Sequence, residues 1–385
     1  MHRVAVIGVG CTRVGELWDK SLKDLIVESA TKALDDAGID KVDIVYVGNA
    51  YSKILQTQGN LGSFTVDSLG FEGIPAVSIE AADCSGSLAF HEAYKAVRSG
   101  LVGKALVVGV EKMSDSSPEE VAKALMSCED QDYVAFTGVT QPGLHALVLR
   151  LYMETFKVKH EEIAEFTVKA HKNASNNPYA QFKNPLKVED VLRSPILADP
   201  LRLLEYTTVA DGSAALVLCS IEEAEKMGKK PVVEVLGSAS ATDKLYLPER
   251  IGKLSFNATR EAAKKAFEEA KFSVDKVNFV ETHDSSTIMG VISLEDLGFV
   301  GKGRGASLVV EGGIEIDGKI PTNTMGGSKG RGNPVGATGV YQLVEAVLQL
   351  RGEAGKNQVK DAKIGLTHTI AGVGNFATVN ILGCL

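Results

Sequence analysis

Short apolar runs alternate with longer amphipathic stretches along most of the 385-residue chain. Residues 4–8, 42–47 and 105–110 have the length and the continuous apolar character of buried strands, and residues 21–37 repeat apolar positions with a helical period. Strands that alternate with helices in this way are typical of α/β layering. The pattern therefore predicts an α/β fold with a buried sheet.

Two phrases of the sequence recur in the same order in the second half of the chain. The first is a helix end followed by a strand, which residues 33–45 and 266–280 share. The second is a turn of small residues that opens a helix, with matching positions at Gly86, Ala93 and Arg98 and again at Gly339, Ala346 and Arg351. We expect a duplicated α/β unit with copies beginning near Val4 and Val232, the alternative being chance repetition.

The expected domains follow from this duplication. Residues 1–113, completed by residues 201–230, are predicted to form the first half, and residues 231–385 the second. The intervening segment 114–200 contains a stretch rich in asparagine, proline and aromatic residues at 173–179. Such a segment is typical of an insertion that covers a site, so we expect a loop domain there.

Composition narrows the class of protein. Hydrophobic residues at 44% and charged residues at 23% indicate a globular rather than a disordered chain. The 41 basic and 49 acidic side chains give a net charge of −8, without the basic excess that nucleic-acid binding needs. No apolar run approaches the roughly 20 residues of a membrane span, and the amino terminus enters a strand without a cleavage-site pattern. We expect neither nucleic acid nor a membrane as partner, and a cytoplasmic location.

The five cysteines include one candidate nucleophile. Their odd number, without a C-x-x-C pair or the spacing of a zinc site, favours free thiols and no metal site. Cys84 lies where the strand-like residues 76–80 give way to the helical residues 88–97. Unpaired amide hydrogens and the helix dipole lower a thiol pKa at such a position. The alternative is a small buried residue that fits a tight helix start.

A glycine-rich segment at residues 325–339 leads into a helix near the carboxyl end of the chain. Glycines there would let backbone amides approach a ligand. The segment lacks the ending of a P-loop, and no G-x-G-x-x-G closely follows the first strand. Nucleotide hydrolysis and dinucleotide binding are therefore disfavoured.

Six motifs, in order along essentially the whole chain, resemble the thiolase family, in particular the branch of sterol-carrier-protein-type and archaeal acetoacetyl-CoA thiolases. They are Asp83-Cys84-Ser85-Gly86-Ser87, Glu111-Lys112-Met113, Asn176-Asn177-Pro178-Tyr179, Glu281-Thr282-His283-Asp284 and the segments 332–339 and 368–374. The resemblance implies a duplicated five-layer αβαβα fold with an inserted loop domain. It also implies a thiolase reaction on coenzyme A thioesters, which are substrates, with no permanently bound cofactor.

The resemblance further implies a role for each site residue. Cys84 matches the acylated nucleophile, and its backbone amide and that of Ile370 would hold the acyl oxygen. His283 lies in the loop where this branch carries a histidine, and His368 lies where many thiolases have a second, proton-carrying cysteine. Asn333 departs from the family's G-H-P loop, whose histidine takes the thiol proton, because asparagine cannot act as a base.

A related family offers a way to accommodate this departure. Ketoacyl synthases of type III and plant polyketide synthases share the fold and use a Cys-His-Asn set, which Cys84, His283 and Asn333 resemble. Their histidine and asparagine donate to the enolate oxygen, each contributing about 2.7 to 4 kcal/mol by analogy with other oxyanion holes. Ser285 replaces a cysteine frequent in the sterol-carrier-type loop and is too weakly acidic to carry protons, which leaves His368 for that task, with His283 as competitor.

Three further residues are candidates for substrate binding. His145 follows Gln141-Pro142-Gly143, which predict a loop that leads into a helix, and would face the pocket. Lys329 and Arg331 flank the G-N-P loop and would meet a phosphate of coenzyme A, the alternative being two solvated surface charges.

The sequence thus predicts an acetyl-CoA acetyltransferase-like enzyme that condenses two acetyl-CoA to acetoacetyl-CoA, or runs the reverse thiolysis, and feeds mevalonate and isoprenoid synthesis. A ketoacyl-synthase-III-like condensation or other acyl transfer, and a weakly catalytic acyl-CoA-binding subunit of a multienzyme complex, remain alternatives. The resemblance implies a homodimer or tetramer. For the archaeal branch it also implies a complex with 3-hydroxy-3-methylglutaryl-CoA synthase through a zinc-containing OB-fold protein.

Overall fold

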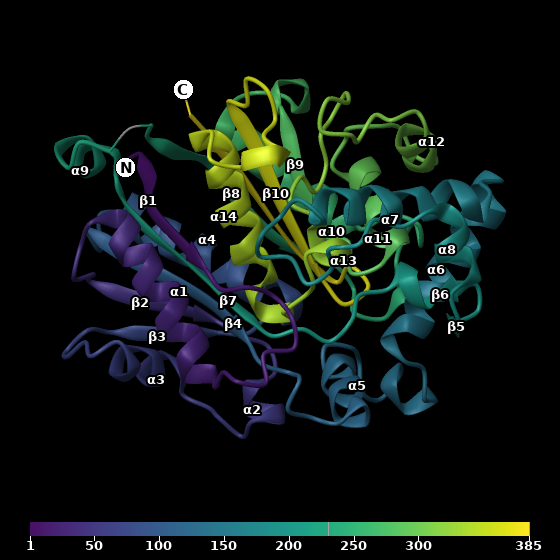
Figure 1. Cartoon of the computed structure of the whole chain (residues 1–385), viewed down its shortest axis with the longest axis horizontal. Helices are drawn as coiled ribbons and strands as arrows, with labels where there is room; N and C mark the ends of the chain where they lie inside the picture. Colours follow the sequence, from purple (N-terminus) through teal and green to yellow (C-terminus); the bar gives the residue numbers. More distant parts are fainter. Residues whose placement is uncertain (230, 385) are drawn as a thin grey trace.

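A nine-stranded mixed sheet runs through the molecule in the computed structural model, which describes residues 1–229 and 231–384 (Figure 1). From one edge to the other its strands are β3 (Ala76–Ile79), β2 (Ile44–Gly48), β4 (Lys104–Glu111), β7 (Gly212–Ser220), β1 (Val4–Cys11), β8 (Val233–Thr242), β11 (Phe376–Gly383), β10 (Ile364–Ala371) and β9 (Phe279–Thr282). Every residue of β1 and β2 is buried, as expected for strands covered on both faces.

The second half of the sheet repeats the pairing of the first. The pairs β1–β7 and β7–β4 are antiparallel and β4–β2 is parallel, and β8–β11, β11–β10 and β10–β9 repeat this series. A parallel bridge between Val280 and Thr322 takes the place that β3 has in the first half. The halves join where residues 4–6 of β1 pair with residues 233–235 of β8. The predicted duplication is therefore confirmed.

Helices complete five layers around the two half-sheets. Helix α1 (Leu22–Ala37) packs on the outer face of the first half and α10 (Asn257–Ala270) on that of the second, while α4 (Ser85–Arg98) and α14 (Thr338–Arg351) pack against each other between them. Helices α4 and α14 begin one residue before the paired Gly86 and Gly339, and they end at the paired Arg98 and Arg351. A Cβ at Gly339 would lie 2.5 Å from Ser87 Cβ, so glycine is what lets these helices approach. The predicted αβαβα fold is confirmed.

Local sequence explains where the helices end. Helix α1 starts at a capping box, in which the Ser21 side chain accepts from the Asp24 amide and the Asp24 side chain accepts from the Ser21 amide. It stops at Gly38, whose left-handed φ of 69° ends the helix. The apolar face between these caps packs on β1 and β7, which confirms the helix expected over residues 21–37.

The helices of segment 114–200 gather at one flank of the molecule (Figure 1). They are α5 (Pro118–Met126), α6 (Gln141–Phe156), α7 (His160–Ala174) and α8 (Val188–Arg193), and the short strands β5 (Ile196–Ala198) and β6 (Leu201–Arg202) follow. The other helices are α2 (Ser52–Leu55), α3 (Leu61–Ser68), α9 (Ile221–Lys226), α11 (Thr287–Asp296), α12 (Gly305–Val310) and α13 (Gly327–Gly330). Single 3₁₀ turns are η1 (Ala82–Cys84), η2 (Ala135–Thr137), η3 (Leu203–Glu205), η4 (Leu247–Glu249), η5 (Val274–Lys276), η6 (Val335–Ala337) and η7 (Gly355–Asn357).

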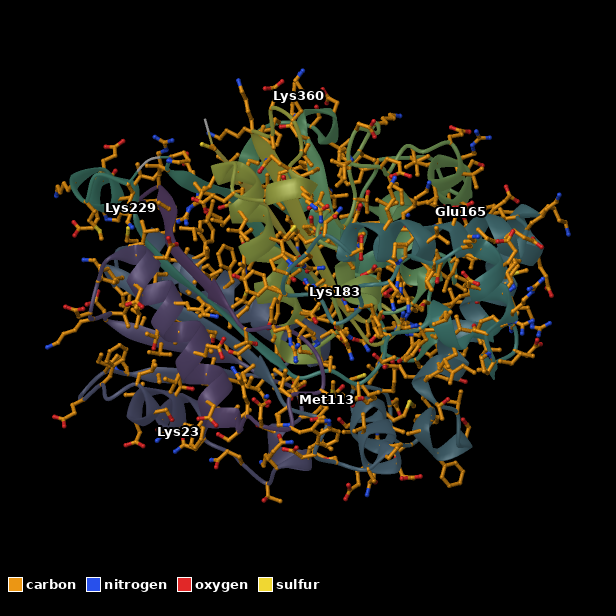
Figure 2. All side chains as sticks on the ribbon, viewed as in Figure 1. Lys23, Met113, Glu165, Lys183, Lys229 and Lys360 are labelled. Atoms are coloured by element: carbon orange, nitrogen blue, oxygen red, sulfur yellow. The ribbon has the colours of Figure 1, made fainter. Side chains whose placement is uncertain are left out.

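Charged side chains extend from the surface and apolar side chains fill the core, as expected for a globular protein. Lys23 and Lys360 extend from the periphery, whereas Met113 is only 2% exposed and lies inside (Figure 2). All five cysteines are free thiols, as the sequence predicts. Within the residues that the structure describes, no helix combines the length and the apolar character needed to cross a membrane.

Candidate active site

Cys84 closes the turn η1 and directly precedes helix α4, so the predicted strand-to-helix turn is present. Ala82 in this turn has a left-handed φ of 48°, which residues with a side chain rarely adopt. The turn is stabilised by Ser85, whose hydroxyl accepts from the Ala81 amide at 2.9 Å and donates to the Ala82 carbonyl at 2.6 Å. The backbone is therefore strained at Ala82, two residues before Cys84.

The environment of Cys84 differs from the one expected at a helix start. The side chain is fully buried, and its Sγ lies 3.7 Å from the Phe376 carbonyl oxygen. Burial raises the pKa of the Cys84 thiol well above its ordinary value, and the adjacent Asp83 carboxylate raises it further. The expected lowering by the helix dipole is thus overridden, and Cys84 rests as a neutral thiol that needs a base to become a nucleophile.

The Asp83 carboxylate brings two of the predicted site residues together. Asn333 Nδ2 donates to Asp83 Oδ1 at 3.1 Å, and His283 Nε2 lies 3.9 Å from the same oxygen. The Thr338 hydroxyl donates to Asn333 Oδ1 and thereby fixes which end of the amide faces Asp83. Burial raises the pKa of Asp83 to about 6, against the lowering effect of the Asn333 hydrogen bond. Asp83 stands in the motif around Cys84, but nothing in the sequence indicates its central position.

Two histidines face this cluster with neutral rings. Among the described residues, neither ring nitrogen of His283 has a hydrogen-bond partner, and burial lowers its pKa well below 6.5. His145 of α6 lies with Nδ1 2.8 Å from Ser286 Oγ and its ring edge-on to Tyr206, at 5.4 Å between centroids. Burial lowers the pKa of His145 to about 4. Both imidazoles are therefore neutral near pH 7, and each has one ring N–H that can donate and one ring nitrogen that can accept a hydrogen bond.

His368 is placed differently from the expectation. Its Nδ1 lies 2.9 Å from Thr282 Oγ1 and its Nε2 lies 2.9 Å from Thr259 Oγ1, so the ring links β10 to β9 and α10. Burial lowers the pKa of His368 to about 3. Because both ring nitrogens already have hydroxyl partners, this geometry argues against His368 as the proton carrier.

The end of β10 lies beside Cys84. Ile370 lies within the ladder between β10 and β11, opposite Ala377. The residue that packs against Cys84 is Ala371, and Gly372 then begins the turn to β11 with a left-handed φ of 50°. The backbone group beside the Cys84 sulfur is the Phe376 carbonyl of β11, and the Ile370 amide as a donor to the acyl oxygen stays a prediction.

Lys329 and Arg331 are buried rather than exposed. Lys329 Nζ donates to the Tyr206 carbonyl at 2.6 Å, and burial lowers the pKa of Lys329 to about 8. Arg331 Nη1 pairs with Glu345 at 2.8 Å, and its guanidinium lies 5.1 Å from the ring centroid of Tyr341. Both charges hold the glycine-rich loop inside the molecule, and this contradicts the expected contact with a coenzyme A phosphate.

Two cavities lead toward the cluster. The first, of about 540 Å³, ends at Asn333 and is lined mainly by apolar side chains of α5, of the start of α6 and of residues 206–209. The second, of about 640 Å³, is bounded near Cys84 by Ala82, Ala371 and Phe376. Cys84 lines neither cavity, so a substrate that reaches the sulfur must displace one of these neighbours. Volumes of this size suit a small-molecule ligand.

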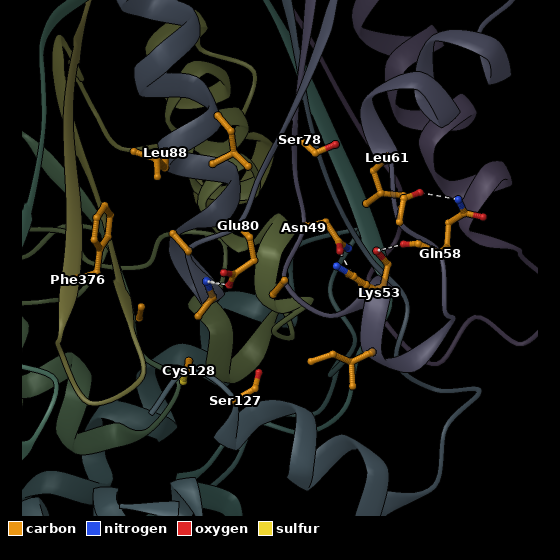
Figure 3. A pocket seen from close by; sticks show the side chains of 18 of the residues that line it. Asn49, Lys53, Gln58, Leu61, Ser78, Glu80, Leu88, Ser127, Cys128 and Phe376 are labelled. Atoms are coloured by element: carbon orange, nitrogen blue, oxygen red, sulfur yellow. Dashed lines mark hydrogen bonds between the residues drawn. The ribbon is translucent and has the colours of Figure 1, made fainter. Parts of the chain in front are cut away.

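Cys128 adds a second sulfur beside Cys84. It lies on the wall of the 640 Å³ cavity together with Phe376 (Figure 3). Gln141 Nε2 donates to its Sγ at 3.6 Å, and a Cβ at Gly372 would lie 3.3 Å from the same sulfur. Burial raises the pKa of Cys128 well above its ordinary value, so it is a neutral thiol. Cys128 lies in none of the six motifs, so the sequence gives no signal for it.

Comparisons with known proteins agree with this architecture. The family description "Thiolase, N-terminal domain" matches residues 4–222, and "Thiolase C-terminal domain-like" matches residues 239–384. The chain is 43% identical to the acetyl-CoA acetyltransferase of Methanothermobacter thermautotrophicus over 99% of both chains. It is 32% identical to human sterol carrier protein 2 over 99% of this chain and 72% of that protein.

A solved structure shows the same fold at lower sequence similarity. The Ltp2-ChsH2(DUF35) aldolase superposes with a TM-score of 0.86 at 22% identity, covering 99% of this chain and 98% of that one. The two family descriptions cover both halves of the duplicated fold, and the identity to an acetyl-CoA acetyltransferase extends over the full length. This chain therefore belongs to the thiolase family and is an acyltransferase.

Proposed function

We propose that the protein is an acetyl-CoA acetyltransferase-like thiolase that condenses two acetyl-CoA to acetoacetyl-CoA, or runs the reverse thiolysis, through an acyl-enzyme on Cys84. The observation that carries this proposal is the meeting of the Cys84 turn, His283 and Asn333 around one carboxylate, with an apolar cavity that ends at Asn333. The 43% identity to an acetyl-CoA acetyltransferase supports acetyl-CoA as the substrate.

In the first half-reaction the Cys84 sulfur attacks the thioester carbonyl of acetyl-CoA. The raised pKa of the thiol requires a base, and the neutral His283 ring, which has no other partner among the described residues, takes the proton. The carbon–sulfur bond to coenzyme A then breaks, and the proton moves from His283 to the departing sulfur. The products are acetyl-Cys84 and free coenzyme A.

In the second half-reaction a second acetyl-CoA binds with its thioester oxygen between His283 Nε2 and Asn333 Nδ2. These two nitrogens lie around a single point, because both now face Asp83 Oδ1. Each donor aimed at a developing enolate oxygen lowers the activation free energy by about 2.7 to 4 kcal/mol. Carbon–carbon bond formation is thus feasible without the G-H-P histidine.

The segment 114–200 serves in this proposal as the loop domain over the site. Its helices α5 and α6 line the cavity that ends at Asn333, and His145 and Cys128 approach the cluster from it. A homodimer or tetramer, a complex with 3-hydroxy-3-methylglutaryl-CoA synthase and a zinc-containing OB-fold protein, a role in mevalonate and isoprenoid synthesis and a cytoplasmic location follow only from the family resemblance. They stay predictions.

The Cys-His-Asn set also favours a second candidate, a ketoacyl-synthase-III-like condensation. One assay separates the two: the enzyme is supplied with acetyl-CoA alone, and then with acetyl-CoA and malonyl-CoA, while acetoacetyl-CoA and carbon dioxide are measured. The proposal expects acetoacetyl-CoA from acetyl-CoA alone. Product only with malonyl-CoA, together with carbon dioxide, would establish the second candidate, and no product in either case would favour an acyl-CoA-binding subunit.

A matched pair of variants tests the nucleophile in the same assay. Cys84→Ala is expected to abolish acetoacetyl-CoA formation, since no other described thiol stands at the start of α4. Cys384→Ala removes a free thiol at the end of β11 and is expected to leave the rate unchanged. Equal activity of both variants would overturn the assignment of Cys84.

A further inference from the structure

A buried carboxylate lies at the centre of the site, where the family resemblance assigns none. We propose that Asp83 is a catalytic acid–base residue, whose carboxylate accepts the proton removed from the methyl carbon of the second acetyl thioester. This inference rests on the proposed function, and it answers which group acts as base once the G-H-P histidine is an asparagine.

Three other groups near the site are unsuited to carry this proton, and the fourth, His283, holds the thioester oxygen in this step. Asn333 has no basic nitrogen, and the Ser285 hydroxyl is too weakly acidic and basic to exchange protons near neutral pH. His368 has both ring nitrogens bonded to threonine hydroxyls. Asp83 has a carboxylate oxygen in direct contact with Asn333 and faces His283 as well.

Geometry places the carboxylate beside the reacting carbon. Asp83 Oδ1 sits 3.1 Å from Asn333 Nδ2 and 3.9 Å from His283 Nε2, which are the two donors proposed for the thioester oxygen. A thioester oxygen that binds these donors displaces Asp83 Oδ1 by a short distance. The methyl carbon is only two bonds from that oxygen, so it comes to lie next to the displaced carboxylate.

The same displacement makes Asp83 a stronger base. The Asn333 hydrogen bond lowers the pKa of Asp83, so transferring this donor to the substrate raises the proton affinity of the carboxylate. The carboxylate would therefore be most basic in the complex in which the methyl proton must be removed. Substrate binding and base strength are thus coupled through one amide.

The titratable groups around Asp83 leave its charge unopposed. The titratable groups that face Asp83 are the thiols of Cys84 and Cys128, the phenols of Tyr51 and Tyr206, and the imidazole of His283. Burial raises the pKa of each of these thiols and phenols and lowers the pKa of His283, so all are neutral near pH 7. Without a neighbouring cation among them, Asp83 keeps the raised pKa of about 6 that suits a base working near neutrality.

The proton balance of the step closes within the site. The methyl C–H bond breaks, its proton forms an O–H bond on Asp83, and its electron pair moves into the enolate held by His283 and Asn333. The enolate carbon bonds to the acetyl carbon on Cys84, and the Cys84 carbon–sulfur bond breaks. The proton on Asp83 then moves to the Cys84 thiolate, which restores the neutral thiol and the free carboxylate.

Asp83→Asn tests the proposal, because it keeps the shape of the side chain and an oxygen that can accept from Asn333. Deuterium wash-in from D₂O into the methyl group of acetyl-CoA measures proton removal directly, and single-turnover acetylation of Cys84 measures the first half-reaction. We expect wash-in and condensation to fall at least about 100-fold, with acetylation little changed. The wild-type rate is expected to fall as the pH drops below about 6, and the variant is expected to lose this dependence.

Asp43→Asn is the matched control, since Asp43 is an exposed carboxylate outside both cavities that accepts from the Gly103 and Lys104 amides, which asparagine can also do. It is expected to leave wash-in unchanged. Asp83→Ala with added formate is the second test: formate should restore wash-in in proportion to its concentration, which a purely structural role would not allow. Wash-in by Asp83→Asn at or above the wild-type rate, or the absence of rescue by formate, overturns the proposal. Wild-type protein that never acetylates Cys84 instead overturns the proposed function.

Discussion

Replacing Asn333 by aspartate tests the central contact of the site without relying on activity. The amide nitrogen that now donates to Asp83 Oδ1 at 3.1 Å becomes a second carboxylate oxygen at nearly the same place. Two negative charges at this separation repel by about 5 kcal/mol at an effective dielectric constant of about 20. This is enough to keep one proton on the pair through neutral pH, because one pKa unit corresponds to about 1.4 kcal/mol.

The sign of the pH dependence follows from proton counting. The unfolded variant releases this proton near the ordinary aspartate pKa of about 3.9, whereas the folded variant keeps it, so the folded state binds more protons. The free energy of unfolding of Asn333→Asp therefore falls by about 1.4 kcal/mol for each pH unit through neutrality. In the wild type Asp83, with its pKa of about 6, also lowers the free energy of unfolding as the pH rises. This decrease levels off above about pH 6, where Asp83 has lost its proton in the folded state as well.

Urea unfolding at a series of pH values measures the difference. Between about pH 6.5 and about pH 8, Asn333→Asp is expected to lose about 2 kcal/mol more than the wild type. Adding Asp83→Asn to the variant removes one charge of the pair and is expected to abolish the extra slope, which completes a double-mutant cycle. Parallel pH curves for the variant and the wild type would refute the contact between Asn333 and Asp83.

Three other changes have defined outcomes. Ala122→Trp fills the cavity that ends near the site and is expected to raise KM for acetyl-CoA about tenfold, about 1.4 kcal/mol of binding; an unchanged KM would contradict the proposed route. Lys112→Met leaves the buried Asp211 carboxylate, 3.0 Å away, without its cation and should lower the free energy of unfolding in urea by about 3 to 5 kcal/mol; a loss below about 1 kcal/mol would refute this. Gly372→Ala adds a Cβ at 2.4 Å from Glu129 Oε1 at a φ of 50°, so activity should fall while circular dichroism is unchanged, and full activity would show that this turn does not shape the site.

The layered fold could be predicted from the sequence, because the hydrophobic periodicity and the positions of small residues can be read from short segments of the chain. The recurring phrases mark α4 and α14, whose glycines Gly86 and Gly339 let the two helices approach closely. The join of the two half-sheets through residues 4–6 and 233–235 was not accessible. Edge pairing of this kind depends on how the two halves dock, and the pattern of a single strand carries no signal for it.

The site was predictable only as far as its motifs reach. Cys84, His283 and Asn333 lie on loops that the resemblance names, whereas Asp83 gains its position from burial against Asn333, which appears only after folding. His368 shows the opposite case, because a residue in a matching motif is held by hydroxyls on two other elements. The sequence also carries no sign that Lys329 and Arg331 are buried, because charged residues in a glycine-rich loop usually face solvent.

Mass spectrometry of the intact wild-type protein mixed with acetyl-CoA, followed by peptide mapping, tests the acyl-enzyme most directly. The account predicts a gain of one acetyl group on the peptide that contains Cys84, lost again when coenzyme A is added. An unchanged mass, or an acetyl group found only on Cys128 or another residue, would contradict it.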